Sequence, residues 1–278
     1  MRLVWQLVAV AAVAFIGGQG AAAVEDNAAL SLIVGALTAV LSVLVYRWVV
    51  RRTEHRPVTE LARDGAGSAT GRGALLGAAL FGAIIVNLAL LGDYDVHGVG
   101  SVGGAVGLIG FMAAAAATEE LLFRGVLLRL VEERFGTWIA LTSTGLLFGL
   151  MHLFNPDATV WGALAIAIEA GGMLGAAYVA TRSLWLPIGL HFGWNFAESG
   201  LFSTEVSGND TRQGLLDATM SGSKLLTGGE FGPEAGLYAV VFGLLTTIVF
   251  LRLARRRGHL VPSRRKAGRV DATATLSR

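Results

Sequence analysis

Seven ionisable side chains and one strong hydrogen-bonding amide lie inside stretches of the sequence that are otherwise apolar. They are Glu119, Glu120, Arg124, His152, Glu169, His191, Glu198 and the amide Asn195. A charge inside the hydrocarbon of a membrane costs about 2.5–3.5 kcal/mol even on the mildest insertion scale, so such residues usually mark function. Two carboxylates, two histidines and an amide can activate water and stabilise an oxyanion, which is the chemistry of amide hydrolysis.

The spacing of these residues sorts them onto helix faces. Glu120 and Arg124 are four positions apart with the carboxylate first, which is the favourable direction for an ion pair on a helix. Glu119 lies about 100° further around the same helix, so this pair does not neutralise it. The same four-residue spacing recurs twice further along the chain, in Phe148–His152 and in His191–Asn195.

Counting along the helices places the polar groups at one depth. Glu119 precedes an expected hairpin turn at Gly136 by 17 residues, and His152 follows that turn by 16. At about 1.5 Å per residue, both lie roughly 25 Å from the turn. Counted from Leu128, Glu119 is about 13 Å below the membrane surface, and His191 reaches a similar depth. We therefore expect three helices to deliver these side chains to one layer.

The residue types assign roles within that layer. Glu119 is the candidate general base, and His152 would share its proton or orient the water. His191 and Asn195 would donate hydrogen bonds to the oxyanion that develops on an attacked carbonyl. This chemistry requires no cofactor. Zinc stays an alternative, because Glu119, His152 and His191 would satisfy the three protein ligands of a catalytic zinc ion, although the chain has no H-E-x-x-H motif.

Three further side chains leave alternatives open. Phe148 either contributes to the site or simply packs. Glu169 either lines the same cavity or pairs with Arg182 beyond the end of its span. Glu198 is expected to be structural or to face outward.

The composition excludes a soluble domain. Of the 278 residues, 54% are hydrophobic and 15% are charged, whereas a soluble domain carries about 25% charged residues. The absence of cysteine excludes thiol nucleophiles, disulfides and cysteine-bound metals. Stretches of the length that a bilayer-spanning helix needs, about 20 residues, lie near 3–23, 28–50, 74–91, 99–128, 136–153, 159–180, 186–203 and 236–254. The sequence therefore predicts an all-α, polytopic membrane helix bundle of about eight transmembrane helices.

The charges between the spans predict the orientation of the bundle. Loop 46–73 carries six arginines, and residues 252–278 carry nine Lys or Arg against one Asp. The alternate loops are acidic. Because Lys and Arg are enriched in cytoplasmic loops, we expect both termini in the cytoplasm, a multi-pass protein of the cell membrane, and an active-site cavity on the cytoplasmic side. The basic tail is expected to contact lipid head groups and not nucleic acid.

The chain divides into four regions by these criteria. Residues 1–98 hold the N-terminal helices and the basic loop, and residues 99–203 hold the expected catalytic core. Residues 204–254 hold an external loop and the last helix, and 255–278 form a basic tail that we expect to be disordered. Loop 204–234 is rich in Gly and Ser and is interpreted as a flexible linker, with a cover for the outer face as the alternative. The first helix also resembles a cleavable signal peptide, although we expect it to be retained.

Three motifs in one order carry a resemblance to a known family. Glu119-Glu120-x-x-x-Arg124, Phe148-x-x-x-His152 and His191-x-x-x-Asn195, each on a separate helix, resemble the CPBP family, also called the Abi family. It comprises CAAX proteases and bacteriocin-processing enzymes, with the Rce1-type prenyl-protein endopeptidase as its eukaryotic member. The resemblance covers about residues 100 to 200. It implies an intramembrane glutamic endopeptidase in which Glu120 and Arg124 hold the surroundings of Glu119 in place.

The sequence thus predicts hydrolysis of a peptide or protein substrate in or at the lipid bilayer. Two alternatives come from other classes: a proton-coupled transporter, and a non-catalytic immunity or scaffold factor. Transporters tend to show inverted repeats and broken helices, and no such repeat is visible in this sequence.

Overall fold

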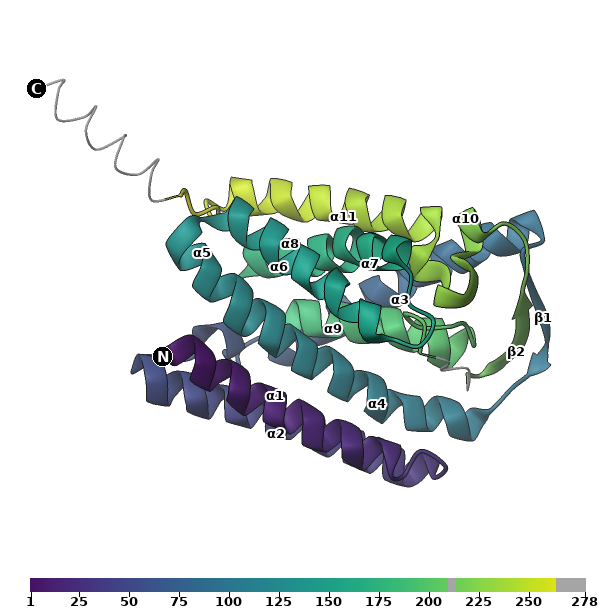
Figure 1. Ribbon diagram of the computed structural model, residues 1–278, viewed down its shortest axis with the longest axis horizontal. Helices are drawn as coiled ribbons and strands as arrows, with labels where there is room; N and C mark the ends of the chain where they lie inside the picture. Colours follow the sequence, from purple (N-terminus) through teal and green to yellow (C-terminus); the bar gives the residue numbers. More distant parts are fainter. Residues whose placement is uncertain (210–213, 264–278) are drawn as a thin grey trace, which may run out of the picture.

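The computed structural model describes residues 1–209 and 214–263, and the tail beyond 263 lies outside the described residues. Its helices run side by side as one bundle, with a small sheet at one end (Figure 1). The principal helices are α1 (Arg2–Ala22), α2 (Ala28–Glu54), α3 (Ala66–Leu91), α4 (Val102–Glu120), α5 (Arg129–Phe135), α6 (Thr137–Met151), α7 (Val160–Ile166), α8 (Gly172–Thr181), α9 (Trp185–Asn195) and α11 (Leu237–Arg256). The predicted all-α bundle is confirmed.

Seven helices in the described part of the chain are long and apolar enough to cross a membrane. The longest runs from Val102 to Phe135, because the π-helical segment η2 (Leu121–Leu128) joins α4 to α5. The eighth expected span, 186–203, is helical as α9 and η5 (Phe196–Leu201), with 11 and 6 residues. These 17 residues are at the short end of what a bilayer requires, and the bundle encloses most of them.

The turn between α5 and α6 lies where the sequence predicts it. Gly136 has φ 85°, a left-handed conformation that glycine adopts without steric cost. A Cβ at Gly136 would also come within 2.9 Å of the carbonyl oxygen of Val261. The C-terminal segment therefore packs directly on this turn.

Glycines on both helices let α3 and α9 pack backbone to backbone. A Cβ at Gly77 would come within 2.2 Å of the carbonyl oxygen of Leu190, and one at Gly193 within 2.0 Å of that of Ala74. The same holds four residues earlier on each helix, at Gly73 and Gly189. Small residues at this spacing permit close approach of membrane helices. Since α9 carries His191 and Asn195, this contact fixes the position of both.

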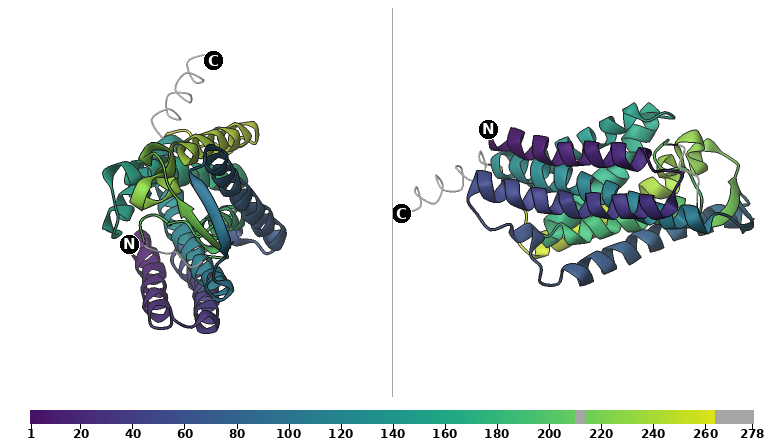
Figure 2. Two further views of the ribbon diagram at one scale, coloured as in Figure 1. Left: turned by 90° about the vertical axis from the view of Figure 1, so that its right-hand side faces the viewer. Right: turned by 90° about the horizontal axis from the view of Figure 1, so that it is seen from below.

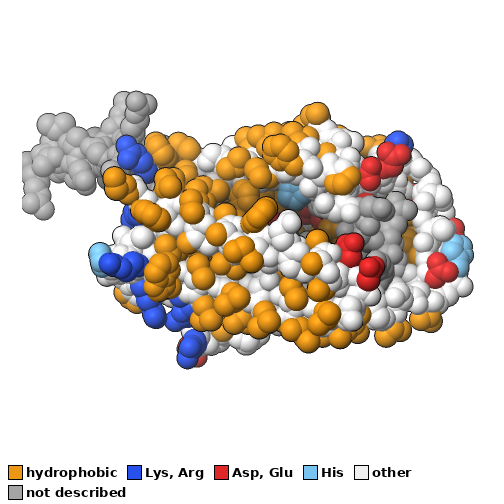
Figure 3. All heavy atoms as spheres, turned by 60° about the horizontal axis from the view of Figure 1, so that its bottom comes forward, with side chains coloured by type: hydrophobic (Ala, Val, Ile, Leu, Met, Phe, Trp, Pro, Cys, Tyr) orange, Lys and Arg blue, Asp and Glu red, His pale blue; other side chains and the backbone are white. Residues whose placement is uncertain are grey.

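The two ends of the bundle differ in charge. The basic end is where α1 begins and α11 ends, and the acidic end holds the turn at 23–27, the sheet and the described residues 202–209 and 214–236 (Figures 1 and 2). Lys and Arg gather mostly at the first end and Asp and Glu at the second, with hydrophobic side chains between them on the face shown in Figure 3. This distribution is typical of a protein that spans a bilayer.

A buried polar network ties the helices together at the basic end. Arg129 donates to Glu54 at 2.8 Å and to Gln6 at 3.1 Å, which joins α5 to α2 and α1. Gln6 is fully buried and donates to Glu54 at 2.7 Å. Arg182 pairs with Glu132, so the alternative in which Arg182 pairs with Glu169 is wrong.

A structured cap covers the acidic end. Strands β1 (Tyr94–Val99) and β2 (Leu216–Met220) pair antiparallel, and three short helices follow: α10 (Lys224–Thr227), η6 (Gly229–Phe231) and η7 (Pro233–Ala235). Phe231 is buried, and the indole of Trp161 donates to the carbonyl of Ala235 at 2.7 Å. The interpretation of 204–234 as a flexible linker is therefore wrong for its described part, because buried side chains fasten it to the bundle.

Candidate active site

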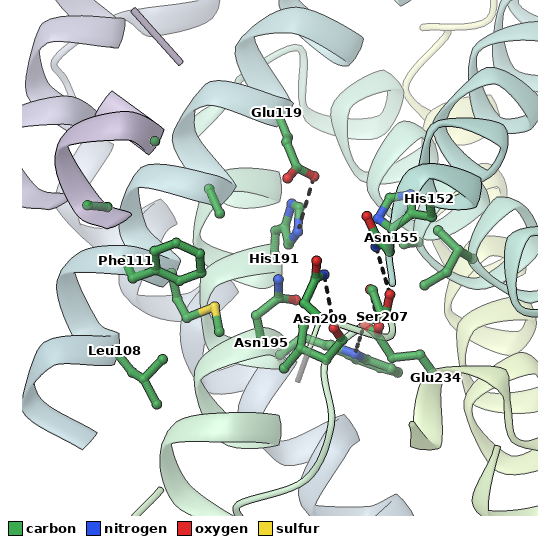
Figure 4. A pocket seen from close by; sticks show the side chains of 18 of the residues that line it. Leu108, Phe111, Glu119, His152, Asn155, His191, Asn195, Ser207, Asn209 and Glu234 are labelled. Atoms are coloured by element: carbon green, nitrogen blue, oxygen red, sulfur yellow. Dashed lines mark hydrogen bonds and ion pairs between the residues drawn. The ribbon is translucent and has the colours of Figure 1, made fainter. Parts of the chain in front are cut away.

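One cavity of about 1050 Å³ gathers the four residues that the sequence singles out. Glu119 comes from α4, His152 from η3 (His152–Phe154) at the end of α6, and His191 and Asn195 from α9. Figure 4 shows Glu119 and His191 pointing toward each other, with His152 across the cavity and Asn195 one turn along α9. The three helices thus meet as the depth argument predicts.

Glu119 and Glu120 are neighbours in sequence but lie in different environments. The Glu119 side chain keeps 34% of its surface exposed, and its Oε2 lies 3.9 Å from Nε2 of His191. Glu120 is fully buried, and its Oε1 accepts from Arg124 at 2.7 Å and from Nδ1 of His191 at 3.0 Å. Glu119 can therefore meet a substrate or water, whereas Glu120 holds two other side chains.

The contact with Glu120 restricts the protonation states of His191. If Nδ1–H donates to the Glu120 carboxylate, Nε2 donates only when the ring carries both protons. Two carboxylates, Glu119 and Glu120, then balance two cations, the guanidinium of Arg124 and the imidazolium of His191. A neutral cluster is the arrangement that buried charges favour, because an unpaired charge is costly in a low-dielectric interior.

Phe148 packs in the middle of this cluster. It is buried, and the guanidinium carbon of Arg124 lies 4.6 Å from its ring centroid, within the range of a cation–π contact. The rings of His152 and His191 lie 4.9 Å and 6.2 Å from it. The backbone carbonyl of Phe148 also contacts Nδ1 of His152 at 2.8 Å. Nε2 is then the nitrogen of His152 that remains for chemistry.

Glu169 lines the same cavity and is nearly fully buried. It lies on the π-helical segment η4 (Ala167–Gly171) between α7 and α8. The other two π-helical segments, η2 and η5, begin directly after Glu120 and Asn195. Such segments are rare in proteins overall, but those that occur are frequently found at functional sites. Glu198, on η5, is completely buried, so it does not face outward.

The arrangement of the side chains that could bind a metal ion, Glu119, His152 and His191, does not fit one. No group of three or more His, Asp or Glu side chains in the described residues is arranged to hold one. Glu119, His152 and His191 surround a common space without converging on one point (Figure 4).

Several lining residues were not identified from the sequence. Asn155, Ser207, Asn209, Trp194 and Glu234 all line the cavity, and four of them are labelled in Figure 4. Glu234 accepts hydrogen bonds from Trp194 at 3.1 Å and from Ser207. Only the cap brings Ser207, Asn209 and Glu234 to the site, and the sequence of a polar loop carries no signal of where it packs.

The cavity extends toward the acidic end, not toward the basic end as we expected. Its lining includes Glu25 and Asp26 in the turn between α1 and α2, and Ser101 before α4, but no Lys or Arg among the described residues. The expectation counted depth from Leu128, whereas the continuous helix ends at Phe135. Glu119 therefore lies near the middle of that helix. Which side of the membrane each end faces stays a prediction.

Comparison with known proteins gives one match. Residues 101–197 match the family described as type II CAAX prenyl endopeptidase Rce1-like. This region includes α4 and α9, with all four residues that the sequence singles out as catalytic. No curated protein and no solved structure gives a significant match to the chain.

Proposed function

We propose, from the match of residues 101–197 to the Rce1-like family of CAAX endopeptidases, that the chain is an intramembrane glutamic endopeptidase. Its substrate is a peptide or protein segment at the membrane. One observation carries the proposal: Glu119, His152, His191 and Asn195 line a single cavity, with Glu119 accessible and Glu120 already paired.

The proposed reaction starts from a water molecule between Glu119 and His152. The Glu119 carboxylate takes a proton from this water, and the oxygen attacks the scissile carbonyl carbon. The oxyanion that forms accepts hydrogen bonds from Nε2–H of His191 and from the Asn195 amide. The carbon–nitrogen bond then breaks, and the proton held by Glu119 passes to the leaving amine, directly or through His152.

Glu120, Arg124 and Phe148 act as positioning residues in this scheme. The Glu120 carboxylate fixes the ring of His191 through Nδ1, and Arg124 holds Glu120 while also donating to the carbonyl of Ala170 at 2.9 Å. Because an oxyanion donor must be in place before the charge develops, this buried pair supports catalysis without touching the substrate.

The test is cleavage of a peptide library by the purified full chain and by Glu119→Gln. A lost general base is expected to lower kcat/KM by about 10²–10⁴-fold. Glu230→Gln is the matched control, because Glu230 is exposed and does not line the cavity. Undiminished cleavage by folded Glu119→Gln would refute the proposal. A transporter or scaffold would show no cleavage by either the wild type or the control.

A further inference from the structure

Glu169 is a buried carboxyl group without a side-chain hydrogen-bond partner in the described part of the chain. Its side chain is 1% exposed and lines the cavity, and neither of its oxygens has a hydrogen-bond partner among the described residues. Glu234, the other buried acid in the lining, accepts from Trp194 and Ser207. Arg124 is committed to Glu120 and to the carbonyl of Ala170. Glu169 is thus the buried acid of the lining whose two oxygens have no hydrogen-bond partner among the described residues, in contrast to Glu234.

The cation that attracts Glu169 electrostatically, Arg124, is paired with Glu120 and does not line the cavity. Five carboxylates line it, and none of the described lining residues is Lys or Arg; the acids are Glu25, Asp26, Glu119, Glu169 and Glu234. The other ionisable residues in the described lining are His152 and His191, and His191 already pairs with Glu119. An uncompensated carboxylate in a low-dielectric site is costly, and a ligand that brings a positive charge removes that cost.

Two of the five acids stand at the mouth of the cavity. Glu25 and Asp26 are exposed in the turn between α1 and α2. Figure 3 shows a hollow on this face in which His and Asp or Glu side chains are visible, with further acids close by. A cleft lined by one sign of charge concentrates the opposite charge from solution. The mouth and the interior therefore favour the same kind of ligand.

We propose that the cavity selects a peptide that carries a lysine or arginine near the scissile bond, with the basic side chain paired to Glu169. Glu25 and Asp26 attract this side chain to the mouth, and Glu169 binds it inside. The inference rests on the proposed function in one respect, because it takes the bound peptide to be the substrate. Binding of the peptide can nevertheless be measured without cleavage.

The experiment compares peptides that differ by one charge. The probes are fluorescein-labelled 14-residue Leu/Ala peptides with one lysine at successive positions, and the same set with norleucine, which keeps the chain length and removes the ammonium group. Fluorescence polarisation with the full chain in a neutral maltoside detergent gives the ratio of the two affinities. Wild type is expected to prefer lysine at its best position by about 10- to 100-fold, the value of a hydrogen bond to a charged group.

Two pairs of variants identify the acids that cause the preference for lysine. Glu169→Gln is expected to reduce the ratio to near 1, whereas Glu198→Gln, which removes an equally buried carboxyl outside the lining, retains it. Glu25→Gln/Asp26→Asn is expected to lower the ratio about threefold at low salt, as for an exposed pair. Asp95→Asn/Asp217→Asn removes two exposed acids from the sheet at the same end and retains it. The ratio compares peptides on one protein sample, so a partly unfolded sample does not change it.

Each outcome decides between the inference and the proposed function. Equal affinity for both peptides, binding of neither, or equal loss of preference in Glu169→Gln and Glu198→Gln overturns the inference. Cleavage without a lysine preference overturns the inference and leaves the proposed function intact. Preferential binding of lysine peptides without any cleavage supports the inference and refutes the proposed function.

Discussion

The adjacent glutamates on α4 are expected to give opposite phenotypes when each is replaced by glutamine. Glu120 is fully buried, and one of its oxygens accepts from both Arg124 and His191. In Glu120→Gln the guanidinium of Arg124, 2% exposed, loses its carboxylate partner. Breaking a buried pair in this way costs about 3–5 kcal/mol. For a chain of this size that corresponds to a fall of roughly 6–20 °C in the unfolding midpoint.

Glu119→Gln is expected to leave stability almost unchanged. The Glu119 side chain is one-third exposed, and its ion pair with His191 is long at 3.9 Å. Partly exposed pairs contribute about 0.2–1 kcal/mol. The same substitution is expected to remove the general base and with it about 10²–10⁴-fold of kcat/KM. The two variants therefore separate the acid expected to hold the structure from the acid that we propose acts on water.

The assay combines thermal unfolding with peptide cleavage in the same detergent. Intrinsic fluorescence can follow unfolding, because the chain has six tryptophans. Both variants keep the size of the side chain, so differences report the charge. A Glu119→Gln variant that unfolds at a temperature as low as Glu120→Gln, or a Glu120→Gln variant that matches the wild type in stability, would refute the assignment of roles.

Three further predictions concern packing, metal dependence and pH. Gly193→Val drives a side chain toward the carbonyl of Ala74 and displaces α9, so the rate of cleavage should fall by about 10²-fold. Its control is Gly71→Val, where no atom would lie within 4 Å of the added Cβ, and this variant should retain activity. Because Glu119, His152 and His191 do not converge on one metal position, a strong chelator should leave the rate of cleavage unchanged. A loss of cleavage that added Zn²⁺ restores would overturn this prediction. Burial alone would raise the pKa of Glu60, but hydrogen bonds from Arg56 and Tyr46 hold it below its ordinary value. The stability that Glu60 contributes is therefore present above about pH 4.3, the unfolded pKa, and is lost as the pH falls through the lower folded pKa. Unfolding midpoints between pH 6 and pH 3 should accordingly drop less steeply in Glu60→Gln than in the wild type.

The helices and the residues that line the cavity together could be predicted from the sequence, because both depend on local spacing. A bilayer requires runs of apolar residues of fixed length, so the spans and the turn at Gly136 follow from the pattern of charges. A four-residue spacing puts two side chains on one helix face, which is why the pairing of Glu120 with Arg124 was predictable. The high cost of charge in a membrane makes Glu119, His152 and His191 conspicuous without any structure.

The tertiary structure decided which groups face one another and from which end they are reached. His191 contacts Glu120 as well as Glu119, and Glu169 lies in the cavity and not beside Arg182. The cap formed by residues 202–209 and 214–236 brings Ser207 and Glu234 against the bundle, although its sequence resembles a linker. These contacts join residues tens of positions apart, and they depend on helix rotation and on glycine-mediated packing such as that of α3 with α9. Helical periodicity fixes which face a residue occupies, but only the packing of the helices against one another determines what that face meets.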